Sequence, residues 1–241
     1  MNNVMITGVS KGLGLEIAKI FIKNDWKVWG VSRTLTPELE ELINVYPNNI
    51  RWKKFDLSET EDVNETLFKH FVNFDTPLHA FINNAAIAYD DIVTNLKTKS
   101  LEEMFRVNTF TPMMITKYSI RNMLYNNVQG SVIHISSISV HTGYKGLAMY
   151  ASSKGALEAF SKNTAREWGE RKIRSNCIVA GFMETSMSST LSDIQKSRIY
   201  KRTSLKTETS KNSIAETALF LSSDKARSIT GQNIHVDSGT I

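Results

Sequence analysis

The stretch TGVSKGLGLEIA, residues 7–18, decides the fold. It follows an apolar run at 3–7 and opens a segment whose apolar residues recur at helical spacing, so a strand, a glycine-rich turn and a helix succeed one another. Gly8, Gly12 and Gly14 let the backbone turn tightly and approach a phosphate, and the helix start offers unpaired N–H groups. This order of elements is what a dinucleotide site requires, although Gly-x-x-x-Gly-x-Gly departs from the common Gly-x-Gly-x-x-Gly spacing.

The same alternation continues along the chain. Strand-like runs lie at 3–7, 27–32, 50–55, 78–83, 131–136, 173–179 and 233–237, and segments with helical spacing lie between them at 13–24, 37–46, 60–72, 101–127, 148–170 and 213–223. Strands that alternate with helices indicate parallel pairing through right-handed crossovers. We therefore predict an α/β fold: a three-layer, doubly wound (Rossmann) sheet of seven parallel strands with helices on both faces.

Residues 1–241 contain no linker rich in Pro, Gly and Ser, so we expect a single domain. One segment breaks the rhythm: residues 186–209 are polar, rich in Ser and Thr, and lie between the sixth and seventh predicted strands. Ligands of doubly wound sheets bind outside the carboxyl ends of the strands. This segment is a candidate substrate lid, and a plain surface excursion is the alternative.

Composition restricts the classes of function. Apolar residues make up 41% and charged residues 22% of the chain, as in a soluble globular protein, and no run of 18 apolar residues could span a membrane. Met1 is followed by polar residues rather than by a signal peptide, so we expect a cytoplasmic protein. The net charge is +5, but Lys and Arg are scattered, which argues against a nucleic-acid partner. Only residues 195–202, QKSRIYKR, cluster basic groups, as a solvated helix face or near the entrance for an anionic ligand.

Cysteine usage excludes two kinds of site. Cys177 is the only cysteine, so neither an intramolecular disulfide nor a thiolate metal centre can form, and we expect no metal. Its apolar surroundings, NCIVAGF, predict a small buried side chain.

The end of the second strand bears on the choice of dinucleotide. An NAD site usually carries Asp or Glu there to bind the ribose 2′-hydroxyl, but this chain has Ser32 and Arg33, with Lys11 in the glycine turn. A guanidinium can bind a 2′-phosphate through two charge-assisted hydrogen bonds, whereas a carboxylate would repel it. The sequence therefore favours NADP(H) over NAD(H), and solvated surface charges are the alternative reading.

Tyr150 and Lys154 lie four residues apart in MYASSKGALEAF, residues 149–160. Residues four apart share one face of a helix, so the phenol and the ammonium group would lie one turn from each other. Taken alone, the pair does not distinguish a catalytic acid from ordinary surface chemistry.

Together these motifs resemble those of the short-chain dehydrogenase/reductase family in its compact form. They are TGVSKGLG, then NNAA at 83–86, Asn at 108, ISSIS at 135–139 and YASSK at 150–154, and the resemblance covers essentially the whole chain. Among the family's members the chain looks most similar to bacterial 3-oxoacyl-carrier-protein reductases. The resemblance implies an NADP-dependent oxidoreductase that acts on CH–OH and C=O groups.

The resemblance also implies roles for four residues. The family's catalytic serine lies 13 residues before its tyrosine, which selects Ser137. Tyr150 would pass a proton to the substrate carbonyl oxygen, Ser137 would hydrogen-bond that oxygen, Lys154 would bind the nicotinamide ribose and lower the tyrosine's pKa, and Asn108 would anchor a water relay. A free tyrosine titrates near 10, and nearby positive charge would move its pKa toward the working range.

The cofactor positions follow from the same resemblance. The implied cofactor-binding residues are Gly8, Ser10, Lys11, Gly12, Leu13, Gly14, Ser32, Arg33, Asp56, Leu57, Asn83, Ala85, Tyr150, Lys154, Gly181, Met183 and Thr185. For Asp56 a capping role at the next helix is an equal alternative. The candidate pocket residues are Tyr89, His141, Tyr144, Met149, Phe182 and Met187.

Some positions depart from the family pattern. Ala86 and Ala180 stand where glycine and proline are usual, and Ala86 is tolerated only if its φ is negative. Basic residues that would grip acyl carrier protein are sparse, although Arg121 and Arg171 remain. A small polar ketone or alcohol is therefore the favoured substrate, and a 3-oxoacyl thioester on acyl carrier protein is a minority reading.

Two other functions compete with this interpretation. A catalytically silent dinucleotide-sensing protein would have no reason to keep all four catalytic side chains, and a sugar epimerase or dehydratase would need a further substrate domain. The resemblance also implies a homo-oligomer, with a tetramer favoured over a dimer, through the long helices at 101–128 and 147–170.

Overall fold

The predicted parallel sheet is confirmed. The computed structural model describes residues 1–184 and 192–240, and its seven strands pair in parallel in the order β3-β2-β1-β4-β5-β6-β7. The strands are β1 (Asn2–Thr7), β2 (Trp26–Ser32), β3 (Ile50–Lys54), β4 (Ala80–Asn83), β5 (Ser131–Ser137), β6 (Arg174–Ala180) and β7 (Asn233–Val236). The strand order reverses between β1 and β4, which is where doubly wound sheets bind ligands.

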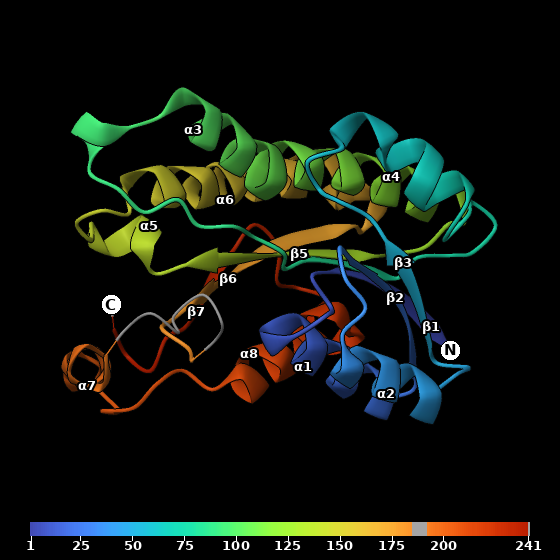
Figure 1. The fold of residues 1–241 in the computed structure, drawn as a ribbon. Helices are drawn as coiled ribbons and strands as arrows, with labels where there is room; N and C mark the ends of the chain where they lie inside the picture. The colour runs from blue at the N-terminus through green and yellow to red at the C-terminus, as the bar shows by residue number, and fades with distance from the viewer. Residues whose placement is uncertain (185–191, 241) are drawn as a thin grey trace.

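Helices cover both faces of the sheet (Figure 1). The helices α1 (Gly12–Lys23), α2 (Pro37–Val45) and α8 (Lys211–Ser222) lie on one face, and α3 (Thr98–Phe105), α4 (Thr111–Tyr125) and α6 (Ala148–Trp168) lie on the other. Two further helices, α5 (Ser139–Thr142) and α7 (Asp193–Arg202), lie toward the carboxyl ends of the strands. Short 3₁₀ turns occur at Thr60–Asp62, Val93–Asn95, Gly169–Arg171 and Asp224–Ala226.

The apolar strands explain this layering. Side chains alternate between the two faces of a strand, so Val4 and Ile6 pack in one apolar cluster while Met5 packs in the other. Both clusters are fully buried at these positions, as a parallel sheet covered on two faces requires. Cys177 is also buried, which confirms the expectation for this thiol.

The long helix expected at 101–127 is interrupted. Residues Arg106–Phe110 form a π-helix between α3 and α4, and the N–H of Thr111 bonds the carbonyl of Arg106, five residues earlier. Pro112 supplies the physical reason, because it has no N–H to bond the carbonyl of Asn108 four residues before it. The interruption falls at a predicted site residue, as π-helical turns frequently do.

The segment expected as a helix at 60–72 also differs. It forms a 3₁₀ turn followed by a π-helix at Val63–Lys69. Its buried residues Val63, Leu67, Phe68 and Val72 recur at a spacing wider than that of an α-helix. Because a π-helix has more residues per turn, it keeps these side chains on the face that packs against the sheet. No helix within residues 1–184 and 192–240 is long and apolar enough to cross a bilayer.

Candidate active site

A cavity of about 760 Å³ opens at the carboxyl ends of the central strands. Its walls come from the glycine turn after β1, the ends of β2, β4, β5 and β6, and the start of α6. The volume lies within the range that small-molecule and cofactor sites occupy. The cavity therefore joins the predicted dinucleotide turn and the predicted catalytic residues in one continuous space.

The glycine turn has the shape of a phosphate cradle. Gly8 has a φ of +78°, and a Cβ atom on Gly14 would lie 2.1 Å from the carbonyl oxygen of Gly8, so neither position accepts a side chain. The N-cap residue of α1 is Lys11, and no side chain caps the helix there. The first N–H groups of α1 remain open toward the cavity, where their partial positive charge suits an anionic group. These residues fit the pyrophosphate of a dinucleotide.

Thr7 and Asn84 hold this turn against β4. The Thr7 hydroxyl oxygen accepts hydrogen bonds from the backbone N–H groups of Asn84 and Ala85, at 3.1 Å each. The Asn84 side chain donates to the Thr7 carbonyl oxygen at 2.9 Å and lines the cavity. The NNAA motif in the sequence does not by itself predict this role for Asn84. By contrast, the predicted residue Asn83 is fully buried and does not line the cavity.

The residues that were predicted to select the dinucleotide line the other end of the cavity. The Ser32 hydroxyl donates to the Thr34 carbonyl at 3.0 Å and accepts from the Trp52 indole at 2.8 Å, so its hydrogen bonds are already committed. Arg33 and Lys11 are exposed, line the cavity, and make no hydrogen bond or ion pair with any part of the chain that the structure describes. Two cationic side chains are thus available for an anionic group at this end.

Three predicted catalytic residues meet at the opposite end. Ser137, Tyr150 and Lys154 all line the cavity, and the Lys154 amine lies 5.9 Å from the centre of the Tyr150 ring. Lys154 is buried, and its amine donates a hydrogen bond to the carbonyl oxygen of Ile135 at 2.8 Å. The four-residue spacing therefore places the Lys154 amine beside the Tyr150 ring, and the hydrogen bond to Ile135 on β5 holds the amine in that position.

Burial controls the charge of this pair. It lowers the pKa of Lys154 to about 8. It also raises the pKa of Tyr150 to about 12, with the Asp90 carboxylate adding to the rise and a hydrogen bond from Ser137 opposing it. In this arrangement burial, rather than the ammonium group of Lys154, dominates the pKa of the phenol. At neutral pH the phenol keeps its proton.

Asn108, the fourth predicted catalytic residue, does not line the cavity. Its side-chain amide accepts from the N–H of Ile87 at 2.9 Å and donates to the carbonyl of Ile87 at 2.8 Å. It also donates to the Ser153 hydroxyl at 3.0 Å, and that hydroxyl donates to the carbonyl of Tyr150 at 2.8 Å. Asn108 thus connects the π-helix to the loop after β4, which contains Ile87, and to α6, which contains Tyr150.

Most of the remaining predicted cofactor residues line the cavity. Those that line the cavity are Ser10, Gly12, Leu13, Asp56, Leu57, Ala85, Gly181 and Met183. Asp56 accepts a hydrogen bond from the N–H of Ser58 at 2.9 Å, so it stabilises a turn rather than capping a helix. A Cβ atom on Gly181 would lie 2.2 Å from the Thr209 hydroxyl, which leaves room only for glycine. Thr185 lies outside the described residues.

Only some of the candidate pocket residues line the cavity. Tyr144 and Phe182 line the cavity, and Met187 lies outside the described residues. Three predictions are wrong, because Tyr89, Met149 and His141 do not line it. Tyr89 bonds Asn95 and Lys97 within its own loop, Met149 packs in the interior, and His141 turns toward Glu158.

The structure also shows the surroundings of the two departures from the family pattern and of the basic residues. Ala86 has no positive φ, so its methyl group fits without backbone strain, and Ala180 ends β6 as a regular strand residue. The basic cluster 195–202 falls on α7, where most side chains are exposed but Arg202 lines the cavity. The solvated helix face therefore describes most of this cluster, and the role as an entrance for an anionic ligand stays a prediction. Arg121 and Arg171 do not line the cavity.

Comparisons with known proteins agree with this geometry. A family model described as enoyl-(acyl carrier protein) reductase matches residues 8–240. The chain is 32% identical to a 3-oxoacyl-acyl-carrier-protein reductase FabG of Buchnera aphidicola subsp. Baizongia pistaciae, over 98% of this chain and 95% of the relative. It is 30% identical to the FabG of Chlamydia pneumoniae, with the same coverage.

Two solved structures are similar over nearly their whole length. One is a 4-hydroxyisoleucine dehydrogenase complexed with NADH, with a TM-score of 0.93, 25% identity, and coverage of 100% of this chain and 98% of that chain. The other is ElxO with NADP bound, with a TM-score of 0.88, 26% identity, and coverage of 99% and 98%. The motifs, the cavity and these matches agree, and the chain belongs to the short-chain dehydrogenase/reductase family of oxidoreductases.

Proposed function

We propose that this protein is an NADP(H)-dependent reductase that converts a carbonyl group to an alcohol, or catalyses the reverse reaction. One observation carries the proposal: Ser137, Tyr150 and Lys154 line the same cavity as the glycine turn and the free cation of Arg33. A substrate carbonyl at the Tyr150 end would then lie in one continuous space with a dinucleotide held at the other end. The bound nicotinamide cofactor would supply the hydride.

The chain's own residues would handle the proton and the developing charge. With a pKa of about 12 the phenol of Tyr150 is protonated at neutral pH, so it is ready to donate to a carbonyl oxygen. The Ser137 hydroxyl would donate a second hydrogen bond to the same oxygen, which stabilises alkoxide character as it forms. Lys154, buried beside the phenol and fixed by Ile135, would hold the ribose hydroxyls.

The preference for NADP(H) rests on Arg33 and Lys11. The two solved relatives differ, since one was determined with NADH and the other with NADP, so their likeness does not choose between the dinucleotides. In this chain Arg33 follows β2, and the hydroxyl of Ser32 is committed to its own loop. Arg33 and Lys11 therefore provide the recognition of a 2′-phosphate, which guanidinium groups bind with two hydrogen bonds.

The substrate is proposed as a small polar ketone or alcohol. The 3-oxoacyl thioester named by the FabG relatives is the second choice. The protein would act in the cytoplasm as one domain over residues 1–241. Residues 186–209 would form a substrate lid, of which residues 186–191 lie outside the part of the chain that the structure describes. The protein would assemble as a homotetramer through α4 and α6. Phe110 and Tyr125, 50% and 66% exposed, support the assembly because they leave apolar surface on the α4 side of the molecule.

The test is a spectrophotometric screen of ketone classes with NADPH and NADH in parallel. NADPH should be preferred, and Arg33→Ala should raise the KM for NADPH by roughly tenfold or more while leaving that for NADH unchanged. Arg227→Ala, which removes an exposed arginine that does not line the cavity, is the matched control. Tyr150→Phe should abolish turnover, and full activity in that variant would refute the proposed chemistry.

A further inference from the structure

Glu158 is a buried carboxylate that the proposed chemistry does not use. It lies on α6 one turn beyond Lys154, so the two side chains share the helix face that packs on β5. Only 8% of it is exposed, and it does not line the cavity. A carboxylate out of reach of water is costly unless hydrogen bonds satisfy it, so its partners are informative.

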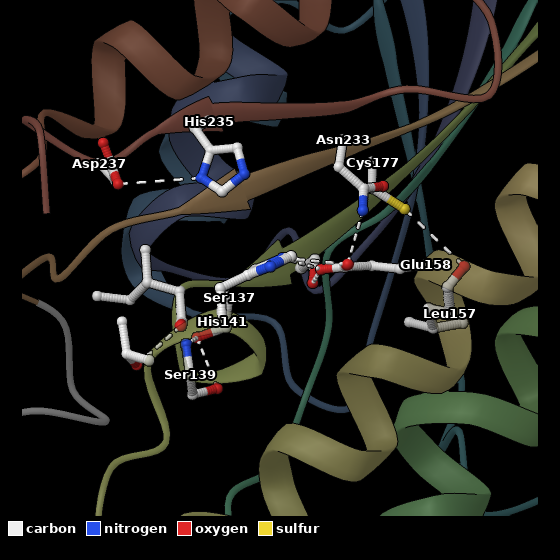
Figure 2. Close-up of polar contacts among 12 residues, drawn as sticks. Ser137, Ser139, His141, Leu157, Glu158, Cys177, Asn233, His235 and Asp237 are labelled. Carbon is white, nitrogen blue, oxygen red and sulfur yellow. Dashed lines mark hydrogen bonds and ion pairs between the residues drawn. The ribbon is translucent and has the colours of Figure 1, made fainter. Parts of the chain in front are cut away.

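Those partners come from three different elements (Figure 2). One carboxylate oxygen accepts from the Ser136 hydroxyl at 2.5 Å and lies 3.2 Å from Nε2 of His141, and the other accepts from the Asn233 amide at 2.7 Å. Ser136 belongs to β5, His141 to α5 and Asn233 to β7. The contacts extend further along β7, because the rings of His141 and His235 lie 5.1 Å apart.

Two of these partners bracket the predicted catalytic serine. Ser136 and His141 lie on either side of Ser137 in the chain, so one carboxylate holds the backbone both before and after that serine. Between these two anchors, the N–H and hydroxyl groups of Ser139 donate to the Ser137 hydroxyl oxygen at 3.2 and 3.0 Å. The direction of the Ser137 hydroxyl therefore depends on a short turn that Glu158 fastens at both ends.

We propose that Glu158 is a positioning residue for Ser137, which it aligns by holding residues 136–141 in one conformation. The inference rests on the proposed function, because it assigns Glu158 an effect only through the serine that would hydrogen-bond the substrate oxygen. Misplacing a catalytic group by about 1 Å can cost on the order of 100-fold in rate. Loss of this carboxylate should therefore lower kcat by roughly 10- to 100-fold, with little change in dinucleotide affinity.

A double-mutant cycle tests the inference. Ser137→Ala should lower kcat by roughly 100-fold or more, as removal of an oxyanion donor does. If Glu158 acts through Ser137, adding Glu158→Ala to Ser137→Ala should cause little further loss. Multiplicative losses would overturn the positioning role and leave the proposed function standing. Full activity in Ser137→Ala would overturn both.

Two further measurements separate positioning from a loss of folding. Glu158→Ala should speed amide hydrogen exchange in the peptide that covers residues 136–142 and leave α1 and the dinucleotide Kd unchanged. Uniformly faster exchange throughout the chain would overturn the proposal. Glu158→Gln keeps an oxygen for Ser136 and His141 and should restore kcat to within about threefold of the parent. Glu41→Ala, an exposed position on α2, is the matched control and should change neither readout.

Discussion

Replacing Lys154 with methionine should change how stability depends on pH. Lys154 is 2% exposed, and burial lowers its pKa from the ordinary 10.5 to about 8. Between those two values the unfolded chain holds a proton that the folded chain has released. Stability therefore rises with pH across this window, and the cost of burying the ammonium group is largest below about pH 8.

The magnitude follows from the two pKa values of Lys154. At about 1.4 kcal/mol per pH unit, the cost of the charge at pH 7 is roughly 3 kcal/mol, and by pH 9.5 it has fallen to roughly 1 kcal/mol. The parent should thus gain about 2 kcal/mol between pH 7 and 9.5 relative to Lys154→Met. Loss of the hydrogen bond to Ile135 costs the variant about 1 kcal/mol at either pH, so it cancels in this comparison. The burial of Cys177, common to both proteins, cancels as well.

The assay is urea unfolding of the parent and Lys154→Met at both pH values, followed by circular dichroism. Lys162→Met, an exposed lysine on the same helix, should show no such pH dependence and serves as the control. An equal stability difference at pH 7 and 9.5 would refute the reasoning, because it would mean that Lys154 titrates as if it were in water.

Three other changes have expected outcomes. Gly14→Ala should abolish dinucleotide binding, measured by nucleotide fluorescence, because its methyl group would lie 2.1 Å from the carbonyl oxygen of Gly8; a near-normal Kd would contradict this. Asp90→Asn should shift the pH–rate profile of alcohol oxidation to lower pH, because the Asp90 carboxylate raises the pKa of Tyr150 and the oxidation needs the phenolate; an unmoved profile would count against the coupling. Cys177, whose thiol has a pKa raised to about 12 by burial, should react with a thiol reagent only when the chain unfolds, and rapid labelling of the native protein would be the opposite result.

Local patterns in the sequence predicted the fold well. The strand at 131–136 and the glycine turn at 8–14 each have a short-range signal, either an apolar run or a spacing of glycines, and each appears where expected. The helix at 101–127 was wrong in part for an equally local reason. Pro112 has no N–H to donate to the preceding turn, and this local break prevails over the strong apolar spacing around it.

Side-chain direction was harder to predict than position. His141 is a candidate pocket residue in the sequence because its loop is expected above the nicotinamide, but its ring turns to Glu158 on α6. The role of Asn84 is equally hard to predict, because its side chain bonds the backbone of Thr7, 77 residues earlier in the chain. Neither contact leaves a periodic signal, since each depends on which strands lie side by side. Such contacts become visible only once the strand order is known.

Local sequence patterns also do not predict the charge states of Tyr150 and Lys154. The spacing of Tyr150 and Lys154 predicts their proximity, and proximity alone predicts that the ammonium group would lower the pKa of the phenol. The fold buries both groups, and burial acts on each separately: it favours the neutral amine and the neutral phenol. Removal from water therefore sets the direction of both pKa values, because desolvation penalises the charged form of each group. A neutral phenol is the form that can donate a proton, which is the protonation state that the proposed reduction requires of Tyr150.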